Sequence, residues 1–295
     1  MATAPEPAHV RKTWTFADLH PFLLFSALVF ALPTLIDVAR MSWSTEQGGH
    51  GPIVVATGLW LIGREWPAMK PLVKPGSPLV TALLLVPGLL LYAIARITGT
   101  LEVESFVMFF CVVVAAYSVL GGAAMGRIWF PLIYLLFSFP PPDTIYAMIT
   151  QPLKIGISGW SVGALYFLGY PVASSGVVIQ IGQYQLLVAA ACAGVNSMIS
   201  LTALGLFYSY IRYRSHPAFM TFLILLILPT AVLVNIIRVI ALLLITYYFG
   251  GAAGQGFFHD LAGISMFLLA LSLIFIFDWL GTPLRHWLEK REKPA

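Results

Sequence analysis

The fold is decided by long apolar runs, and the longest of them reads PAFMTFLILLILPTAVLVNIIRVIALLLITYYF at residues 217–249. Arg238 is the one charged residue within it. A helix needs about 20 predominantly apolar residues to cross the hydrocarbon core of a bilayer. This run exceeds that length, so the sequence predicts a transmembrane helix here.

Comparable apolar segments lie on both sides of this run. They occur at 22–39, 52–69, 78–97, 104–126, 128–139, 192–211 and 260–280. The chain of 295 residues is 59% hydrophobic and only 9% charged, whereas about a quarter of the residues in a soluble domain are charged. We therefore expect an all-α polytopic membrane protein with about eight transmembrane helices.

Basic residues indicate which side of the membrane each loop occupies. With a cytoplasmic N-terminus, the loops that contain Lys70, Arg127 and Arg212 and the C-terminal cluster at 285–293 all lie inside. Basic residues favour cytoplasmic loops. We therefore attribute the net charge of +4 to the membrane topology. Membrane lipid is the expected partner, and no nucleic acid is expected to bind.

The domain organisation follows from these segments. We expect a cytoplasmic N-terminal tail at 1–21, a single transmembrane domain at 22–281 and a basic cytoplasmic C-terminal tail at 282–295. The sequence shows no internal repeat and no second soluble domain.

Two stretches between the apolar runs have other patterns. Within 144–169, polar residues from Gln151 to Ser161 recur at helical spacing, which predicts an amphipathic helix at the outer interface or against the bundle rather than a ninth span. Residues 177–188 carry apolar and β-branched side chains on both sides of Gly182-Gln183. Such a break is typical of a β-hairpin, which here precedes Cys192.

Three reactive side chains occupy comparable places in the apolar segments. Cys192 lies in the small-residue run at 189–196, Arg238 follows Asn235, and His259 precedes the last segment. Cys192 begins an inward segment, and His259 begins the final inward one. Arg238 lies 21 residues after Pro217, about 31 Å along a helix. That distance is roughly one hydrocarbon thickness, so all three are expected near the outer boundary.

This combination suits acyl transfer to a thiol. A cysteine thiol with an ordinary pKa near ~8.5 needs a neighbouring base or cation to become a good nucleophile. His259 is the candidate base, and Arg238 is the candidate partner of a tetrahedral oxyanion. Each residue taken alone also has a common structural interpretation: a buried thiol, an arginine that reaches the headgroups, or a histidine at a helix end.

The second cysteine, Cys111, fits the structural interpretation better, because it lies between Phe110 and Val112 in an apolar segment. It is 81 positions from Cys192, and no CxxC or Cys/His ligand spacing is present. We therefore expect free thiols, no metal site and no cofactor.

At these residues the chain resembles the exosortase/archaeosortase family of membrane cysteine transpeptidases. The resemblance rests on Ala191-Cys192-Ala193-Gly194, on Asn235-Ile236-Ile237-Arg238, and on His259 with Gly263. Many members have serine where this chain has Ala193. The resemblance extends from about 130 to 280, and the earlier helices match by hydropathy alone.

The resemblance implies the roles of the three residues and the substrates. Cys192 would be the nucleophile, Arg238 the oxyanion-binding or substrate-orienting group, and His259 the acid and base. The substrates would be secreted proteins that end in a Pro-Glu-Pro-like motif, a hydrophobic helix and a basic cluster. Cleavage would form a thioester before transfer to an acceptor or to water. The usual setting is the inner membrane of exopolysaccharide-producing Gram-negative bacteria, with the active site facing the periplasm.

Two other functions remain open at this stage. In a transporter of an anionic solute, Arg238 and His259 would bind the anion and Cys192 would be inert. Such a protein would favour broken helices with polar residues at the midplane and related halves. A membrane O-acyltransferase-like enzyme would depend on a histidine and not on Cys192. The sequence leaves the acceptor, the exact recognition motif and the oligomeric state open.

Overall fold

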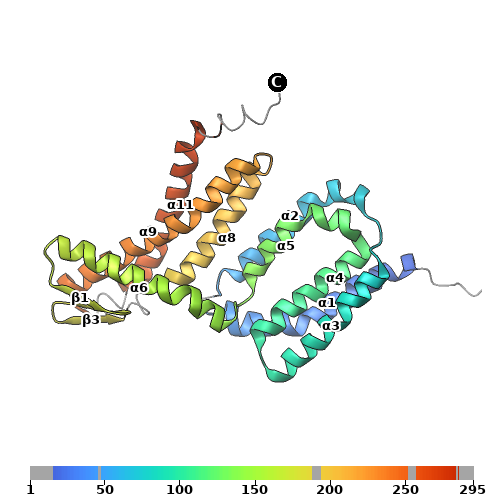
Figure 1. Ribbon diagram of the computed structural model, residues 1–295, viewed down its shortest axis with the longest axis horizontal. Helices are drawn as coiled ribbons and strands as arrows, with labels where there is room; N and C mark the ends of the chain where they lie inside the picture. The colour runs from blue at the N-terminus through green and yellow to red at the C-terminus, as the bar shows by residue number, and fades with distance from the viewer. Residues whose placement is uncertain (1–15, 46–47, 188–193, 252–256, 284, 286–295) are drawn as a thin grey trace, which may run out of the picture. The chain divides into compact units, whose positions relative to one another are not determined.

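The computed structural model describes residues 16–45, 48–187, 194–251, 257–283 and 285, which are mostly helical (Figure 1). The chain divides into two compact units. Unit 1 comprises Met1–Asp37 and Glu65–Trp129, and unit 2 comprises Val38–Arg64 and Phe130–Ala295. The predicted single transmembrane domain at 22–281 stays a prediction, and each unit is described by itself.

Unit 1 is built from three long helices. They are α1 (Phe16–Val38), α3 (Pro78–Thr98) and α4 (Leu101–Arg127). Ser77 and Pro78 begin α3. Proline fits the first helical turn, because a backbone N–H there has no partner within the helix and its absence costs no hydrogen bond. Gly99 ends it with a φ of 68° and donates its N–H to the carbonyl of Ala95. The chain thereby turns back at once, and α4 packs along α3.

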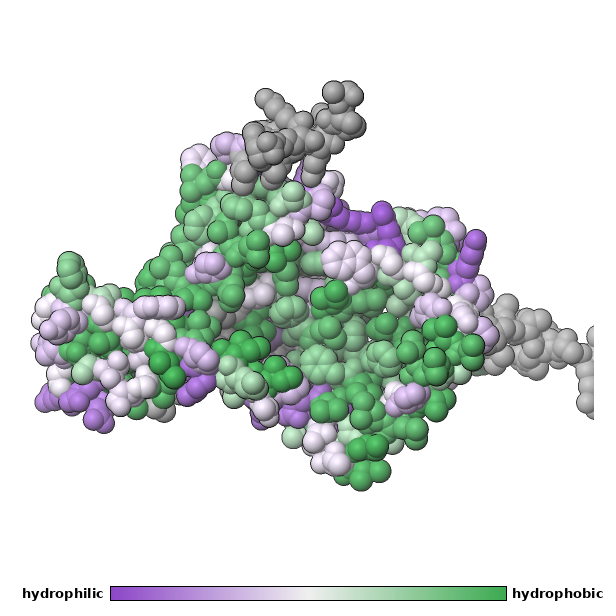
Figure 2. Space-filling view, viewed as in Figure 1, coloured by the Kyte–Doolittle hydropathy of each residue, from purple (hydrophilic) through white to green (hydrophobic). Residues whose placement is uncertain are grey.

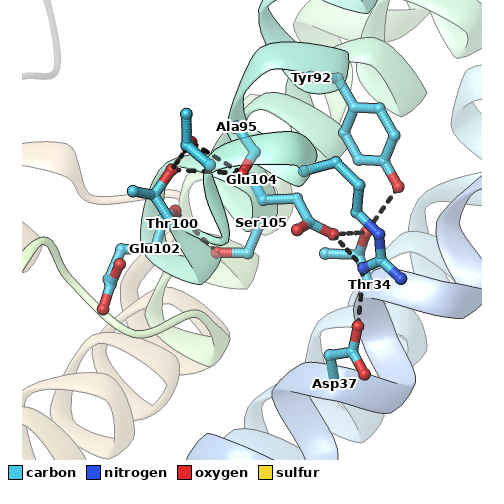
Figure 3. A network of polar contacts seen from close by, with 10 residues as sticks. Thr34, Asp37, Tyr92, Ala95, Thr100, Glu102, Glu104 and Ser105 are labelled. Carbon is cyan, nitrogen blue, oxygen red and sulfur yellow. Dashed lines mark hydrogen bonds and ion pairs between the residues drawn. The ribbon is translucent and has the colours of Figure 1, made fainter.

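A buried carboxylate joins the three helices of unit 1. Glu104 of α4 is 3% exposed. Its Oε1 accepts hydrogen bonds from Thr34 of α1 at 2.6 Å and from Arg96 of α3 at 2.7 Å (Figure 3). Arg96 also pairs with Asp37 at 2.7 Å, and the hydroxyl of Tyr92 lies 2.9 Å from that of Thr34. A carboxylate buried in an apolar bundle is tolerated when it is paired and hydrogen-bonded in this way.

Helix α4 bends at Gly121. This glycine has φ 77° and ψ 169°, which is non-helical. The bend brings the segment before α3 against α4: Lys74 donates its backbone N–H to Leu120 and Gly76 donates to Ser118. A Cβ at Gly121 would lie 1.9 Å from the carbonyl oxygen of Lys74. Both the dihedral angle and the close approach therefore require glycine here.

Unit 2 is organised around one helix. The elements are a π-helix at Ala39–Trp43, α2 (Gly51–Met69, to Arg64 in this unit), α5 (Trp129–Leu135, from Phe130), the 3₁₀ turn Leu136–Ser138, α6 (Asp143–Phe167), β1 (Val172–Ser175), β2 (Val178–Ile181), β3 (Tyr184–Leu187), α8 (Gly194–Tyr213), α9 (Pro217–Phe249) and α11 (Phe257–Leu280). Helix α9 packs against α6, α8, α11 and β3, and α8 also packs against α11. The largest apolar cluster of the unit runs along α9.

The small sheet confirms the predicted hairpin and adds a strand. Strands β2 and β3 are antiparallel, with Ile181 opposite Tyr184 and the two-residue turn at Gly182-Gln183, where Gly182 has φ 57°. Strand β1, which the sequence pattern did not predict, pairs antiparallel with β2 in the order β1-β2-β3. Ile179 and Ile181 alternate with exposed Gln180, so one face of β2 enters the cluster around α9.

Helix α6 forms where an amphipathic helix was predicted, and it packs against α9 rather than lying apart from the bundle. Ser158 and Ser161 of its polar stripe are fully buried. Trp160 and Phe167, in contrast, are 56% and 89% exposed. The buried side of α6 is therefore mixed, because Ile157 and Leu165 are fully buried beside the two serines, while Gln151 of the polar stripe is exposed.

Helices form over every predicted apolar segment, but the count of eight spans is not confirmed. Among the described residues, four helices are long and apolar enough to cross: Phe25–Trp43, Pro78–Thr98, Leu101–Arg127 and Pro217–Phe249. Trp129–Ser138 and Asp143–Phe167 are bent by 85° and give a fifth if counted together. The segment at 128–139 is too short to cross alone, because it stops at Pro140-Pro141-Pro142. Apolar side chains cover much of the surface in view (Figure 2).

Replacing Glu104 by glutamine tests the buried carboxylate. Glu104→Gln keeps an acceptor for Thr34 but leaves Arg96 with Asp37 as its only charged partner in this network. We expect the free energy of unfolding in detergent to fall by about 1–3 kcal/mol. Asp37→Asn is the matched control, because this pair is more than a third exposed; its cost is expected below about 1 kcal/mol. Equal losses in the two variants would contradict the argument from burial.

Replacing Gly121 by alanine tests the bend in α4. The new Cβ would collide with the Lys74 carbonyl at a positive φ, so we expect Gly121→Ala to destabilise the protein by more than about 2 kcal/mol. A Cβ at Gly126, in the same helix, meets nothing within 4 Å. Gly126→Ala is therefore expected to be neutral or stabilising by up to about 1 kcal/mol. Thermal unfolding of the two purified variants in detergent measures the difference, and similar melting temperatures would refute it.

Candidate functional site

Arg238 lies on the buried side of α9. Its side chain is 4% exposed, and Asn235, one turn earlier, is 3% exposed. Both belong to a stripe of α9 residues that the other elements of unit 2 cover. An arginine that only reached the lipid headgroups would be exposed. This burial therefore favours the functional interpretation of Arg238, because a charge inside a membrane bundle is costly to keep.

Further polar side chains lie buried on α9 and on its neighbour α6. Thr230 and Thr246 of α9 and Ser158 and Ser161 of α6 are all at most 2% exposed. The hydroxyl of Thr230 donates to the carbonyl of Leu226, as is common for threonine within a helix. The hydroxyls of Ser158, Ser161 and Thr246 have no hydrogen-bond partner within the described part of the chain. The interior of unit 2 therefore offers hydrogen-bonding groups that its own described residues leave unused.

The structure describes little of the other two predicted residues. Cys192 lies outside the described residues, and α8 begins two residues after it, at Gly194. His259 is the third residue of α11, but its side chain is outside the described set. The structure therefore brings together the three helices α8, α9 and α11. The convergence of Cys192, Arg238 and His259 at one depth stays a prediction.

Cys111 lies in the interior of unit 1. It is 2% exposed within α4, and a Cβ at Gly88 of α3 would lie 2.9 Å from its Sγ. The thiol therefore fills the contact between two closely packed helices, which is the ordinary role of a buried cysteine. This placement leaves Cys111 suitable as a control for Cys192.

No group of three or more histidine, cysteine, aspartate or glutamate residues that could hold a metal ion is present among the residues that the structure describes. The expectation of a site without metal or cofactor stays a prediction. The chemistry considered below uses only side chains of the chain itself.

Comparison with known proteins gives the family. A family model described as "Transmembrane exosortase (Exosortase_EpsH)" matches residues 43–276, which is more than half of the chain. This range contains the positions of Cys192, Arg238 and His259 and all of α2 to α9. Comparisons with curated proteins and with solved structures found no match. The buried arginine of α9, the helical membrane architecture and this match lead to one conclusion: the chain is a multi-pass membrane protein of the exosortase family.

Proposed function

We propose that this exosortase-family protein cleaves the C-terminal sorting signal of secreted proteins through a thioester on Cys192. It acts in the bacterial inner membrane, with its active site facing the periplasm. The observation that carries the proposal is the burial of Arg238 on α9, the helix against which α8 and α11 pack. In the sequence, α8 begins two residues after Cys192, and His259 is the third residue of α11. Family membership supplies the class of substrate.

The first half of the reaction would make the thioester. His259 takes the proton of the Cys192 thiol, and the thiolate attacks the carbonyl carbon of the scissile peptide bond. Arg238 donates hydrogen bonds to the oxyanion of the tetrahedral intermediate. When the C–N bond breaks, the amine of the departing tail takes the proton from His259. The secreted protein is then held as an acyl group on the cysteine sulfur.

The second half of the reaction would release the protein. A nucleophile, either an acceptor group or water, gives its proton to His259 and attacks the thioester carbonyl. Arg238 again stabilises the oxyanion. The carbon–sulfur bond then breaks, and the Cys192 thiolate takes back the proton from His259. A tail that consists of a motif, an apolar helix and a basic cluster fits this location, because its helix spans the bilayer and its basic cluster stays inside.

One observation favours the transporter alternative. Within the described ranges, the helices at Trp129–Ser138 and Asp143–Phe167 form one bent pair, at 85°. Discontinuous helices of this kind form substrate sites in many transporters. A transporter would depend on Arg238 for anion binding and would be indifferent to the thiol of Cys192. The two functions therefore differ in what they require of the cysteine.

Co-expression with a secreted reporter that carries a motif-helix-basic tail tests the thiol. We expect wild type and Cys111→Ala to remove the tail, measured as a loss of reporter mass, and Cys192→Ala to remove none. Cys111 is the matched control because it is the other cysteine and lies in the interior of unit 1. Normal processing by Cys192→Ala would refute the proposed mechanism and leave anion transport as the hypothesis to test.

Substitution of Arg238 by lysine tests the oxyanion role. Lysine keeps the positive charge but replaces the planar, bidentate donor by a single point charge. We expect Arg238→Lys to lower kcat for tail removal by about 10²- to 10³-fold, the usual cost of losing one oxyanion donor. KM for the reporter should change little, because the lost interaction forms in the transition state. Near-normal kcat in this variant would exclude an oxyanion role for Arg238.

A further inference from the structure

Another buried carboxylate lies near the C-terminal end of α11, at the opposite end of this helix from His259. Asp278 of α11 is 6% exposed. Its Oδ2 accepts a hydrogen bond from the Tyr208 hydroxyl at 2.5 Å, and its Oδ1 accepts one from the Tyr213 hydroxyl. The Nε of Arg212 lies 3.1 Å from Oδ2. Three residues of α8 thus converge on one carboxylate of α11, and we call these four residues the inner clamp.

The third helix supports the inner clamp by close packing. The ring of Phe219, near the start of α9, meets the Tyr213 ring edge-on with the ring centroids 4.7 Å apart. A Cβ at Gly281, just after α11, would lie 3.0 Å from the Phe219 ring. Phe219 is therefore enclosed by both partners and is itself 1% exposed. The inner clamp and Phe219 together join α8, α9 and α11 at one end.

The other ends of α8 and α11 belong to the proposed active site. From Tyr208 back to Gly194, α8 extends roughly 21 Å at about 1.5 Å per residue. From Asp278 back to His259, α11 extends roughly 28 Å by the same rise. Each helix is therefore a long arm whose far end is held by the inner clamp and whose near end leads to a predicted reactive residue.

Apolar packing alone does not fix the position of α8 relative to α11 precisely. Contacts between apolar side chains hold two helices together in a membrane, but they are not directional, and lipid competes for the same surfaces. Hydrogen bonds to a buried carboxylate are directional and short, so they fix how far α8 is shifted and rotated against α11. A tilt of about 5° about the inner clamp, over an arm of roughly 25 Å, moves the end that leads to the reactive residue by about 2 Å. A misplacement of about 1 Å can already cost a reaction 10²-fold.

We propose that Asp278 is a positioning residue. By binding Tyr208, Tyr213 and Arg212, it sets the register of α8 against α11 and so the placement of Cys192 relative to His259. The inference rests on the proposed function for its consequence on the reaction, although the register itself does not depend on any reaction. The inner clamp does not touch substrate, and its effect reaches the reactive residues through the two helices.

Kinetics of reporter cleavage test the consequence. Asp278→Asn keeps the shape of the side chain but loses the charge that attracts Arg212 and one acceptor for the tyrosines. We expect kcat to fall about 10- to 100-fold and KM to stay within about twofold of wild type. Ser272→Ala is the matched control on α11, because Ser272 is exposed and its hydroxyl donates to the carbonyl of Leu268 in its own helix; it should behave as wild type. Unchanged kcat in Asp278→Asn, beside an inactive Cys192→Ala, would overturn the clamp proposal and leave the proposed function intact.

Cross-linking tests the register without any catalysis. In a Cys111→Ala background, His259→Cys adds a second thiol, which the proposed function predicts to lie near Cys192, and mass spectrometry measures the disulfide formed on mild oxidation. We expect the disulfide in this parent and at least a fivefold lower initial rate of its formation after Asp278→Asn is added. Because a disulfide requires Cα atoms about 4.4–6.8 Å apart, its formation reports small shifts. An equal rate in the two proteins would overturn the clamp proposal, whereas no disulfide in the parent would contradict the predicted proximity of Cys192 and His259, on which the proposed function rests.

A milder variant covers the case in which Asp278→Asn does not fold. Tyr208→Phe removes one hydroxyl of the inner clamp and keeps the ring, which packs edge-on against Phe275 with the centroids 5.1 Å apart. We expect it to fold, to elute from gel filtration as wild type and to slow both cleavage and disulfide formation by a smaller factor. If Tyr208→Phe and Tyr213→Phe together leave both rates unchanged, the inner clamp does not position the reactive residues.

Discussion

Lipid offers no hydrogen-bond partner to a buried charge, and this constraint decides which helices of the protein are neighbours. Glu104 is held by Thr34 and Arg96, which ties α1, α3 and α4 of unit 1 together. Asp278 is held from α8 in the same manner within unit 2. Apolar surface could pack in many ways, but a buried carboxylate is satisfied only when its donors face it. The few charged residues within the helices therefore carry much of the information that selects one arrangement.

Local patterns were enough to predict most elements of the fold. Each apolar segment forms a helix, and the hairpin turns at Gly182-Gln183 because glycine there adopts a positive φ. The number of crossings was not confirmed, since 128–139 forms a seven-residue helix and a 3₁₀ turn and then bends by 85° into α6. Strand β1 was missed because Ala173-Ser174-Ser175 has no strand pattern of its own. It forms a strand by pairing with β2.

Within the candidate site, the sequence pattern alone singled out the arginine. An arginine inside an apolar run is a candidate for function. The structure buries Arg238, and its role in the reaction stays a prediction. The inner clamp was not predicted, because the three partners of Asp278 are 65 to 70 positions away in the sequence. Ser158 and Ser161 were recognised as one polar face of a helix. The pattern alone left open whether that face pointed to water or to the bundle, and packing against α9 decides for the bundle.

The bend at Gly121 has a consequence for the order in which the protein is synthesised. Its backbone contact is with Lys74, which precedes α3, whereas Gly121 itself comes late in α4. The two backbone segments can meet only after α3 and α4 have both left the ribosome and folded back against each other. All of unit 1 is encoded before Phe130, so this contact can close while most of unit 2 is still being translated. The α3–α4 hairpin is thus available as a finished piece during membrane insertion, before the helices that lead to the proposed reactive residues exist.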